Sequence, residues 1–284
     1  MAKKRTAWER LYDGIRVIRR PDSVCAPPAT DAELDKVESE IGSRLPYSYR
    51  EFLRRFGSGE LQGWVRLNPI TSRRKRTHWT VTSRTLELRD FFAKHSERLG
   101  NHQWLSGLVY FASSGGGDLY AWDPTHVTQT RLHECQFYLL LRHEEEEPFF
   151  AGTSFWRFIE WVEADVRSWS DPEQLREDGP GIYFSPAYLR TKKAPLKGDV
   201  KRWLAWNSGT VLALAKSIRE EGRTDVFPIL ADALEEAGCT NRDLLDSCRG
   251  GAPEIDGPWA LQILLGKEKP EPRTSAPGPR GGLR

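Results

Sequence analysis

Residues 45–59 have the sequence LPYSYREFLRRFGSG, and this stretch predicts the fold more strongly than any other part of the chain. Pro46 suits the first position of a helix, and Gly57 suits its end. Between them, large apolar side chains recur at intervals of three and four residues: Leu45, Tyr49, Phe52, Leu53 and Phe56. Because this spacing places the aromatic rings on one side of a helix, the stretch predicts a helix that packs against a core.

Another helix is expected directly before this one. Thr30 and Glu33 have the Thr-x-x-Glu spacing of a capping box, in which each side chain bonds to the backbone amide of the other. Apolar residues then follow on one face up to Gly42, which supplies a left-handed stop. Later in the chain, residues 88–99 and 154–166 also carry apolar side chains at helical spacing, so each predicts a helix.

The segments between these helices have the patterns of strands. Residues 107–124, GLVYFASSGGGDLYAWDP, predict a β-hairpin, because two apolar runs flank glycines that allow a tight turn. Residues 135–142 alternate apolar and polar side chains, which predicts a strand with one face toward the core. A short strand is expected at residues 64–67 and an edge strand at residues 148–151. Helices and strands in this order indicate an α+β domain over residues 30–169 with a mixed or antiparallel sheet.

The ends of the chain have a different character. Residues 1–29 form a basic N-terminal segment, in which residues 3–20 predict an amphipathic helix that docks on the domain through its aromatic side. Residues 170–200 are rich in proline, glycine and charge, which predicts a linker.

Four short helical patterns, each ending at a glycine, predict a small helical bundle over residues 201–267. Thr240 is expected to cap the third of these helices, and Pro258 to begin the fourth. Residues 268–284 contain too little apolar surface to fold, so a disordered tail is expected.

Composition excludes several classes of protein. The 42 Lys and Arg residues nearly balance the 40 Asp and Glu residues, so a net charge of +2 provides no global field to hold a polyanion. The sequence has no apolar run of the length that crosses a bilayer and no secretory signal, which predicts a cytoplasmic location. The four cysteines lie far apart without the spacing of a zinc ribbon or a redox motif, so reduced thiols are expected.

The order of features in residues 30–166 resembles the SUKH superfamily, which takes in fungal cell-wall-synthesis regulators of the Smi/Knr type and many bacterial proteins. The resemblance is carried by the capped helix, by the Leu-Pro-x-x-Tyr-x-x-Phe-Leu helix, by the strand that enters a glycine turn with two aspartates, and by the late aromatic helix. The matching residues are Leu45, Pro46, Tyr49, Phe52, Leu53, Gly57, Gly59, Gly116, Gly117, Asp118, Tyr120, Asp123 and the stretch 155–162. The chain departs from the pattern at Ser58, where an Asn-Gly turn is common, and in the basic run at 73–76, which resembles an insertion.

This resemblance implies an α+β fold, with a mixed or antiparallel sheet flanked by helices, and without catalytic machinery. No metal or cofactor is expected. The resemblance also implies that the chain binds a protein, because many bacterial members are immunity proteins that bind and block a polymorphic toxin. The C-terminal stretch LADALEEAGCTNRDLLDSCR, followed by GPWALQILLG, resembles a helical extension of unassigned function at the ends of proteins from large-genome bacteria. It suggests a bacterial source.

Carboxylates provide the candidate partner-binding residues. The run of glutamates at 144–147 can imitate nucleic-acid phosphates toward a basic partner, and two aspartates of the hairpin are either turn caps or part of the same acidic patch. The candidates are Asp118, Asp123, Glu144, Glu145, Glu146 and Glu147. The glycines at 115–117 lack the Gly-Lys-Ser/Thr of a phosphate loop, and a strand follows them where a helix would be needed.

Two alternatives to protein binding remain open. A nucleic-acid or membrane-surface adaptor would use the basic segment 3–20 and the densest cationic run, which comprises Arg73, Arg74, Lys75 and Arg76. A metal pair or a cysteine–histidine dyad would use His133 and Cys135, which we expect on one face of a strand, with His126 or His143 as a companion. Since no acidic residue or further cysteine stands at a recognisable spacing, the thiol of Cys135 is expected to belong to the core.

Overall fold

The computed structural model describes residues 6–71, 79–95, 100–142, 147–170, 181–249 and 253–266, with side chains left out at 100–102 and 253–255. The chain divides into two compact units. The first comprises Met1–Arg19 and Ser23–Thr191, and the second comprises Arg20–Asp22 and Lys192–Arg284.

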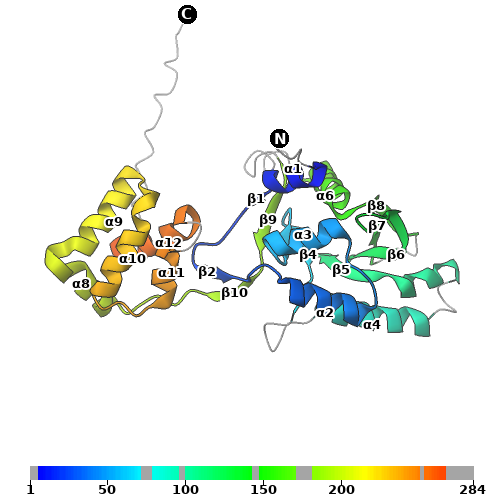
Figure 1. Cartoon of the computed structure of the whole chain (residues 1–284), viewed down its shortest axis with the longest axis horizontal. Coiled ribbons are helices and arrows are strands. Elements are labelled where there is room, and N and C mark those ends of the chain that lie inside the picture. The colour runs from blue at the N-terminus through cyan, green and yellow to red at the C-terminus, as the bar shows by residue number, and fades with distance from the viewer. Residues whose placement is uncertain are drawn as a thin grey trace, which may run out of the picture. The chain divides into compact units, whose positions relative to one another are not determined.

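The first unit is built on an eight-stranded sheet (Figure 1). Its strands, in spatial order, are β1 (Arg16–Val17), β9 (Tyr183–Pro186), β3 (Gly59–Leu61), β4 (Val65–Leu67), β5 (Val109–Ser114), β6 (Leu119–Gln129), β7 (Glu134–Leu140) and β8 (Phe149–Gly152). Strands β1 and β9 are parallel and every other neighbouring pair is antiparallel. A mixed sheet with flanking helices confirms the predicted α+β class. A separate antiparallel pair joins β2 (Ser23–Cys25) to β10 (Tyr188–Thr191).

The helices of this unit are α1 (Ala7–Gly14), α2 (Asp31–Ile41), α3 (Tyr47–Phe56), α4 (Val81–Lys94) and α6 (Phe155–Trp169), together with the 3-10 helix η1 (Gly100–Gly107). The capping box at the start of α2 is confirmed, since the Thr30 side chain accepts from the amide of Glu33 and the Glu33 carboxylate accepts from the amide of Thr30. Gly42 ends α2 with a φ of 68°, as expected of a left-handed stop. The predicted hairpin, third strand and edge strand correspond to β5–β6, β7 and β8.

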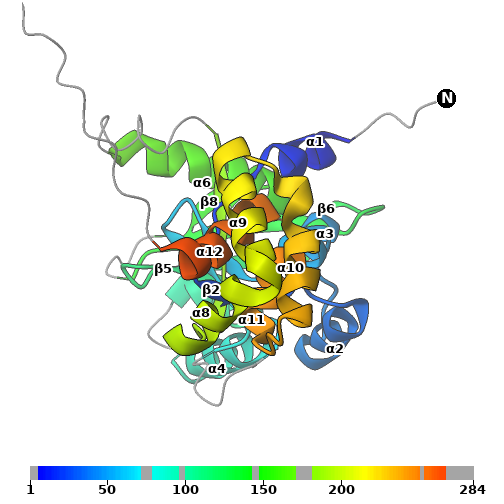
Figure 2. The ribbon, with the colours of Figure 1, turned by 90° about the vertical axis from the view of Figure 1, so that its left-hand side faces the viewer.

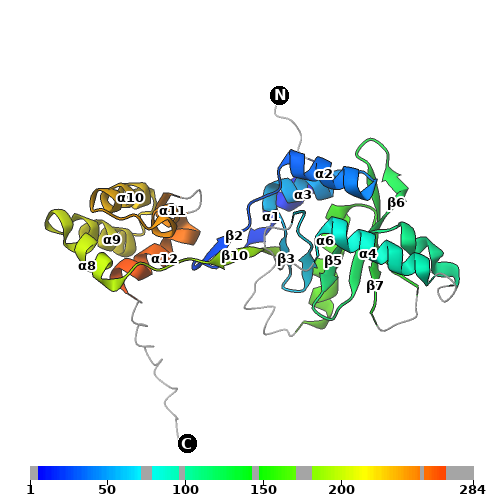
Figure 3. The same ribbon diagram turned by 90° about the horizontal axis from the view of Figure 1, so that it is seen from below.

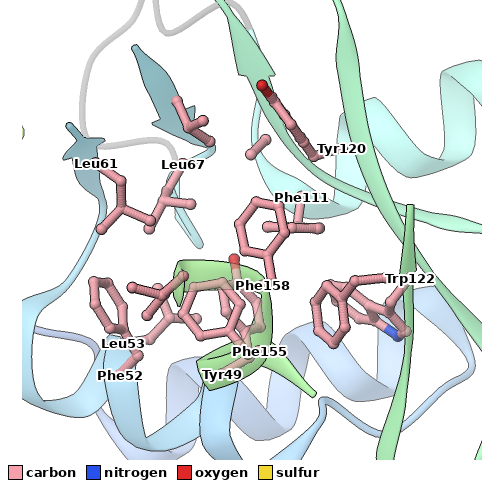
Figure 4. Packing of buried hydrophobic residues seen from close by; sticks show 14 of the residues in the cluster. Tyr49, Phe52, Leu53, Leu61, Leu67, Phe111, Tyr120, Trp122, Phe155 and Phe158 are labelled. Carbon is pink, nitrogen blue, oxygen red and sulfur yellow. The ribbon is translucent and has the colours of Figure 1, made fainter. Parts of the chain in front are cut away.

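The main core lies between one face of the sheet and the helices α3 and α6. Phe111, Tyr120 and Trp122 on the strands face the rings of α3 and α6 (Figure 4). The rings of Tyr49 and Phe155 lie 4.7 Å apart at the centre of this cluster. Alternation along the strands places these side chains on one face, and burial of so many rings supplies most of the apolar driving force for this unit.

The opposite face of the sheet is covered by α4 and η1 (Figure 3). Tyr110 and Ala121, which alternate with the core residues of β5 and β6, pack there against Leu88 and Leu105. The Tyr110 hydroxyl donates to the carbonyl of Leu105 over 2.8 Å. Both faces of the central strands are therefore buried, which explains why β5 contains an almost uninterrupted run of buried residues.

The N-terminal helix docks on α3, as the sequence predicts, but it is shorter than the pattern over residues 3–20 indicates. The ring of Tyr12 lies 5.5 Å from Phe52, and the ring of Trp8 lies 5.7 Å from Tyr47. Helix α1 ends at Gly14, because the chain then turns into β1 and pairs with β9. The basic residues after Gly14 thus belong to an extended segment.

Two strands occur inside the stretch whose composition predicts a linker. Strand β9 lies between β1 and β3, with Phe184 completely buried in the main core. It approaches so closely that a Cβ added to Gly59 would stand 2.3 Å from the carbonyl oxygen of Ser185. Only glycine fits that position. The sequence does not reveal β9, because its four residues stand among the prolines, glycines and charges that predict a linker.

The second unit is a bundle of short helices, α8 (Lys197–Ala205), α9 (Thr210–Glu221), α10 (Phe227–Glu236), α11 (Arg242–Arg249) and α12 (Pro253–Leu265), with short 3-10 turns η2 (Trp206–Gly209) and η3 (Thr224–Val226). Helix α10 packs on α9 and α11, and α12 packs on the same two helices (Figure 2). Two expectations about this bundle are wrong. The side chain of Asn241, and not Thr240, accepts from the Leu244 amide at the start of α11, and Pro258 lies inside α12 because that helix already begins at Pro253.

Candidate partner-binding surface

Asp118 is held within the hairpin between β5 and β6. Its carboxylate accepts a hydrogen bond from the Ser114 hydroxyl over 2.6 Å and one from the Arg142 amide over 3.2 Å. The Ser114 hydroxyl oxygen in turn accepts from the amides of Gly116 and Asp118. These hydrogen bonds connect the hairpin turn to the segment after β7, so the Asp118 carboxylate stabilises the turn. The turn also requires Gly117, whose φ is 94° and whose added Cβ would stand 2.8 Å from the Arg142 side chain.

Asp123 also acts as a cap, and its side chain is only 8% exposed. Its carboxylate accepts from the amide and the hydroxyl of Thr125, and its second oxygen lies 2.6 Å from Nδ1 of His126. Burial favours the neutral carboxyl, but the hydrogen bonds from Thr125 and His126 outweigh it and hold the pKa of Asp123 below its ordinary value. Asp123 is therefore a charged group with its hydrogen bonds directed into its own turn.

The remaining acidic candidates lie between β7 and β8. Glu147 is exposed and stands just before β8. Glu144, Glu145 and Glu146 lie outside the described residues, and so does the basic run of Arg73, Arg74, Lys75 and Arg76. Partner binding by the glutamates and nucleic-acid binding by the basic run therefore remain predictions from the sequence.

His133 and Cys135 do not share a strand face as expected. Strand β7 begins at Glu134, so His133 lies in the preceding turn, with a φ of 49°, while Cys135 points into the main core. Burial, reinforced by the charges of Glu134 and Asp123, raises the pKa of the Cys135 thiol to about 12. Burial and the charge of Arg44 lower the pKa of His133. A catalytic cysteine needs the opposite shift, because the thiolate is the nucleophile.

The residues that carry the family pattern are packing residues. Leu45, Tyr49, Phe52 and Leu53 are all buried in the main core. Pro46 is the residue before the first helical residue of α3, one position earlier than the sequence predicts. The pattern therefore marks the scaffold and leaves the binding surface undefined.

A buried carboxylate that the sequence analysis missed connects four elements. Glu134 is 2% exposed, and it accepts from both the amide and the hydroxyl of Ser48 over 2.8 Å. The Ser48 hydroxyl oxygen accepts from the Phe155 amide, and the Ser48 carbonyl accepts from the Tyr12 hydroxyl. Burial raises the pKa of Glu134, although the bonds from Ser48 oppose the rise. Strand alternation gives no sign that Glu134 turns inward between the starts of α3 and α6.

An exposed group of aromatic side chains at the end of the sheet was also missed. We call it the β8 edge surface, and it consists of Trp104, Tyr138, Phe149 and Phe150. The ring of Tyr138 lies 5.2 Å from that of Trp104 and 6.2 Å from that of Phe150. Phe150 is 52% exposed, Phe149 45% and Trp104 38%. Scattered exposed apolar residues are ordinary, but neighbouring exposed rings at a sheet edge are typical of interaction surfaces.

Two further observations concern metals and membranes. Among the described residues, no three His, Cys, Asp or Glu side chains are grouped so that they could hold a metal ion. Within those same parts of the chain, no helix is both long enough and apolar enough to cross a bilayer.

The comparison with known families agrees with the fold. Residues 28–161 match the model of the SMI1 / KNR4 family (SUKH-1). The match begins just before α2 and ends inside α6, so it includes the hairpin, the third strand and the edge strand, and it excludes β1, β9 and the helical bundle. No curated protein matches the chain. Residues 28–161 of this protein therefore form a domain of the SUKH superfamily.

Proposed function

We propose that this chain is a non-catalytic binding protein of the immunity type, which binds a bacterial toxin and occludes its active surface. The observation that carries the proposal is the SUKH match over residues 28–161, since this family is known for toxin immunity and for Smi1/Knr4 regulatory roles. The protein acts in the cytoplasm in this proposal, where it meets the toxin.

The chemistry of the described side chains supports binding over catalysis. Cys135 is the one cysteine in residues 28–161, and its buried thiol has a raised pKa and therefore stays protonated at neutral pH. The Asp123–His126 pair caps a turn, and the Asp123 carboxylate also accepts a hydrogen bond from the Thr125 hydroxyl. The Asp123 carboxylate and the His126 ring, a combination that can activate a nucleophile elsewhere, are here engaged within one turn.

The acidic residues supply the means of capture in this proposal. Asp118 and Asp123 already have internal partners, so the exposed Glu147 and the three glutamates before it in sequence provide the long-range attraction. Electrostatic attraction of this kind speeds association with a basic partner and weakens as salt is added.

The test is co-expression of the full chain with the toxin encoded by an adjacent gene, with growth and co-purification as readouts. Protection together with a stable complex is expected. Replacing all four glutamates at 144–147 by glutamine should slow association by about tenfold at low salt, while dissociation changes little. The matched control replaces Arg73, Arg74, Lys75 and Arg76 by serine and should leave protection intact.

Two results would overturn the proposal. One is failure to protect against, or to bind, any toxin encoded beside it. The other is strong, salt-sensitive RNA binding that the substitutions at 73–76 abolish, which would favour the nucleic-acid adaptor.

A further inference from the structure

Strand β8 ends the sheet and presents aromatic rings on both of its faces. It pairs with β7 on one side only, with Phe149 opposite Leu139 and Phe150 opposite Tyr138. Since successive residues of a strand point to opposite faces, Phe149 lies at the rim of the main core and Phe150 lies on the face of α4 and η1. Exposed rings thus flank both sides of the sheet edge.

Edges of sheets are usually protected by charges, proline or irregular pairing. The second half of β8 is irregular, because the pairing shifts at Ala151 and Gly152 packs against the start of α6, and Glu147 and Pro148 stand directly before its first half. The first half keeps Phe149 and Phe150 in regular register and about half exposed. The apolar surface of these two rings remains in contact with water until another molecule covers it, and covering it is favourable.

The charges beside these rings are negative. Glu147 is exposed and stands two residues before Phe149, and the chain carries Glu144, Glu145 and Glu146 immediately before it. Of the described arginines nearest to β8 in sequence, Arg142 has its side chain against Gly117 of the hairpin turn, and Arg157 donates to the Glu160 carboxylate over 2.8 Å.

Rings combined with carboxylates select a particular kind of partner. A guanidinium group stacks on the face of an aromatic ring and pairs with a carboxylate at its edge, and it is less strongly hydrated than an ammonium group. A second copy of this chain fits poorly, because it would bring two runs of four glutamates to one short interface.

We infer that the β8 edge surface is where this protein docks an arginine-bearing segment of its partner. The inference rests on the proposed function and specifies which surface and which chemistry perform it. Phe149, Phe150 and Trp104 stack on the guanidinium groups, and Glu147 pairs with them.

The test titrates the isotope-labelled full chain with a capped peptide of alternating glycine and arginine, and it follows the indole N–H signal of Trp104 by NMR. The signal is assigned by its loss in Trp104→Phe. We expect that signal to move, and we expect the double variant Phe149→Ser, Phe150→Ser to bind the peptide about tenfold more weakly. Glu147→Gln should weaken binding by about two- to threefold. The corresponding glycine–lysine peptide should bind several-fold more weakly than the arginine peptide.

The matched control is Trp169→Ser, because Trp169 is 53% exposed, close to the value for Phe150, and its ring lies 5.1 Å from that of Trp64, just before β4. It should bind the peptide like the unchanged protein. An unmoved Trp104 signal, equal affinity for the lysine peptide, or equal weakening by Trp169→Ser would overturn the inference. A dimer in sedimentation that the double variant dissolves would also overturn it, in favour of a second copy as the occupant.

Binding of the adjacent toxin separates this inference from the proposed function. If the double variant still binds and neutralises the toxin normally, the function stands and the β8 edge surface is wrong. If the peptide binds at Trp104 while no adjacent toxin binds the chain, the surface stands and the immunity function is wrong.

Discussion

The main core and the β8 edge surface are built from the same kinds of side chain and yet differ in what those side chains do. In the core, Phe155 contacts the rings of Tyr49, Phe52 and Phe111 at centroid distances of 4.7–5.9 Å and is fully buried. At the edge, Phe150 touches one ring, that of Tyr138 at 6.2 Å, among the described contacts and is half exposed. The difference teaches that aromatic content alone does not separate residues that stabilise from residues that are available to a partner.

The largest expected effect comes from deleting a ring of the core. Phe155→Ala removes a fully buried phenyl group from the centre of the aromatic cluster and leaves a cavity there, so it should lower the free energy of unfolding by about 3–5 kcal/mol. Urea unfolding followed by far-ultraviolet circular dichroism measures this. A cost below about 1 kcal/mol would show that the core is not organised around this residue.

The next effect concerns the buried carboxylate. Glu134→Gln replaces an acceptor by a group that also donates, opposite the Ser48 amide, and should destabilise the protein by about 1–3 kcal/mol near neutral pH. The raised pKa of Glu134 means that the native state binds the proton more tightly than the unfolded state. The contribution of Glu134 to stability is therefore largest below the ordinary carboxyl pKa and falls as the pH rises through the folded-state pKa.

The pH dependence can be checked by unfolding both proteins across the acid range. The stability difference between the unchanged protein and Glu134→Gln should shrink as the pH rises. Glu147→Gln, which alters an exposed carboxylate at the edge, should change the free energy of unfolding by about 0.5 kcal/mol or less. A difference that grows with pH for Glu134→Gln would contradict the assignment of a raised pKa.

A smaller effect of opposite sign is expected at Tyr49. Its hydroxyl is buried and has no hydrogen-bond partner among the described residues, and burial raises its pKa. Tyr49→Phe removes that unpaired polar atom and should stabilise the protein by about 1 kcal/mol. The matched control is Tyr110→Phe, which removes a hydroxyl that donates to the Leu105 carbonyl and should destabilise. Thermal unfolding of the two variants should give shifts of opposite sign.

The smallest expected effect is at the edge itself. Phe150→Ala makes the same change as Phe155→Ala, but at a half-exposed position, so it should change the free energy of unfolding by about 0.5 kcal/mol or less. Measured in the same urea series, the two substitutions should differ several-fold. A large loss at Phe150 would mean that the ring stabilises the sheet and is not available to a partner.

Local signals predict much of the scaffold. The capping box at Thr30, the helical spacing from Tyr49 to Phe56 and the glycine turn before Asp118 each predict an element that the structure contains. These features succeed because each depends on residues within a few positions of one another. Helix limits were less accurate at Gly14 and Pro258, where pairing with β9 and an earlier helix start override the pattern.

The candidate site was predicted less well. The sequence offers Asp118 and Asp123 either as turn caps or as part of an acidic partner-binding patch, and in the structure both cap turns. Neither the inward turn of Glu134 nor the exposure of Phe149 and Phe150 could be predicted from sequence. A glutamate in an alternating strand normally faces water, and phenylalanines in a strand normally face a core. Their actual environments depend on which elements lie above and beside them.

The sequence by itself determined where helices and strands form in the SUKH domain, and with them the family, because capping, periodicity and turn chemistry are local properties. Only the tertiary structure decided that β9 returns to lie between β1 and β3, that Glu134 joins the starts of α3 and α6, and that the rings of Phe149 and Phe150 on β8 stay exposed. These outcomes depend on contacts between residues far apart in the chain. Burial is a property of the assembled fold, and no local pattern contains it.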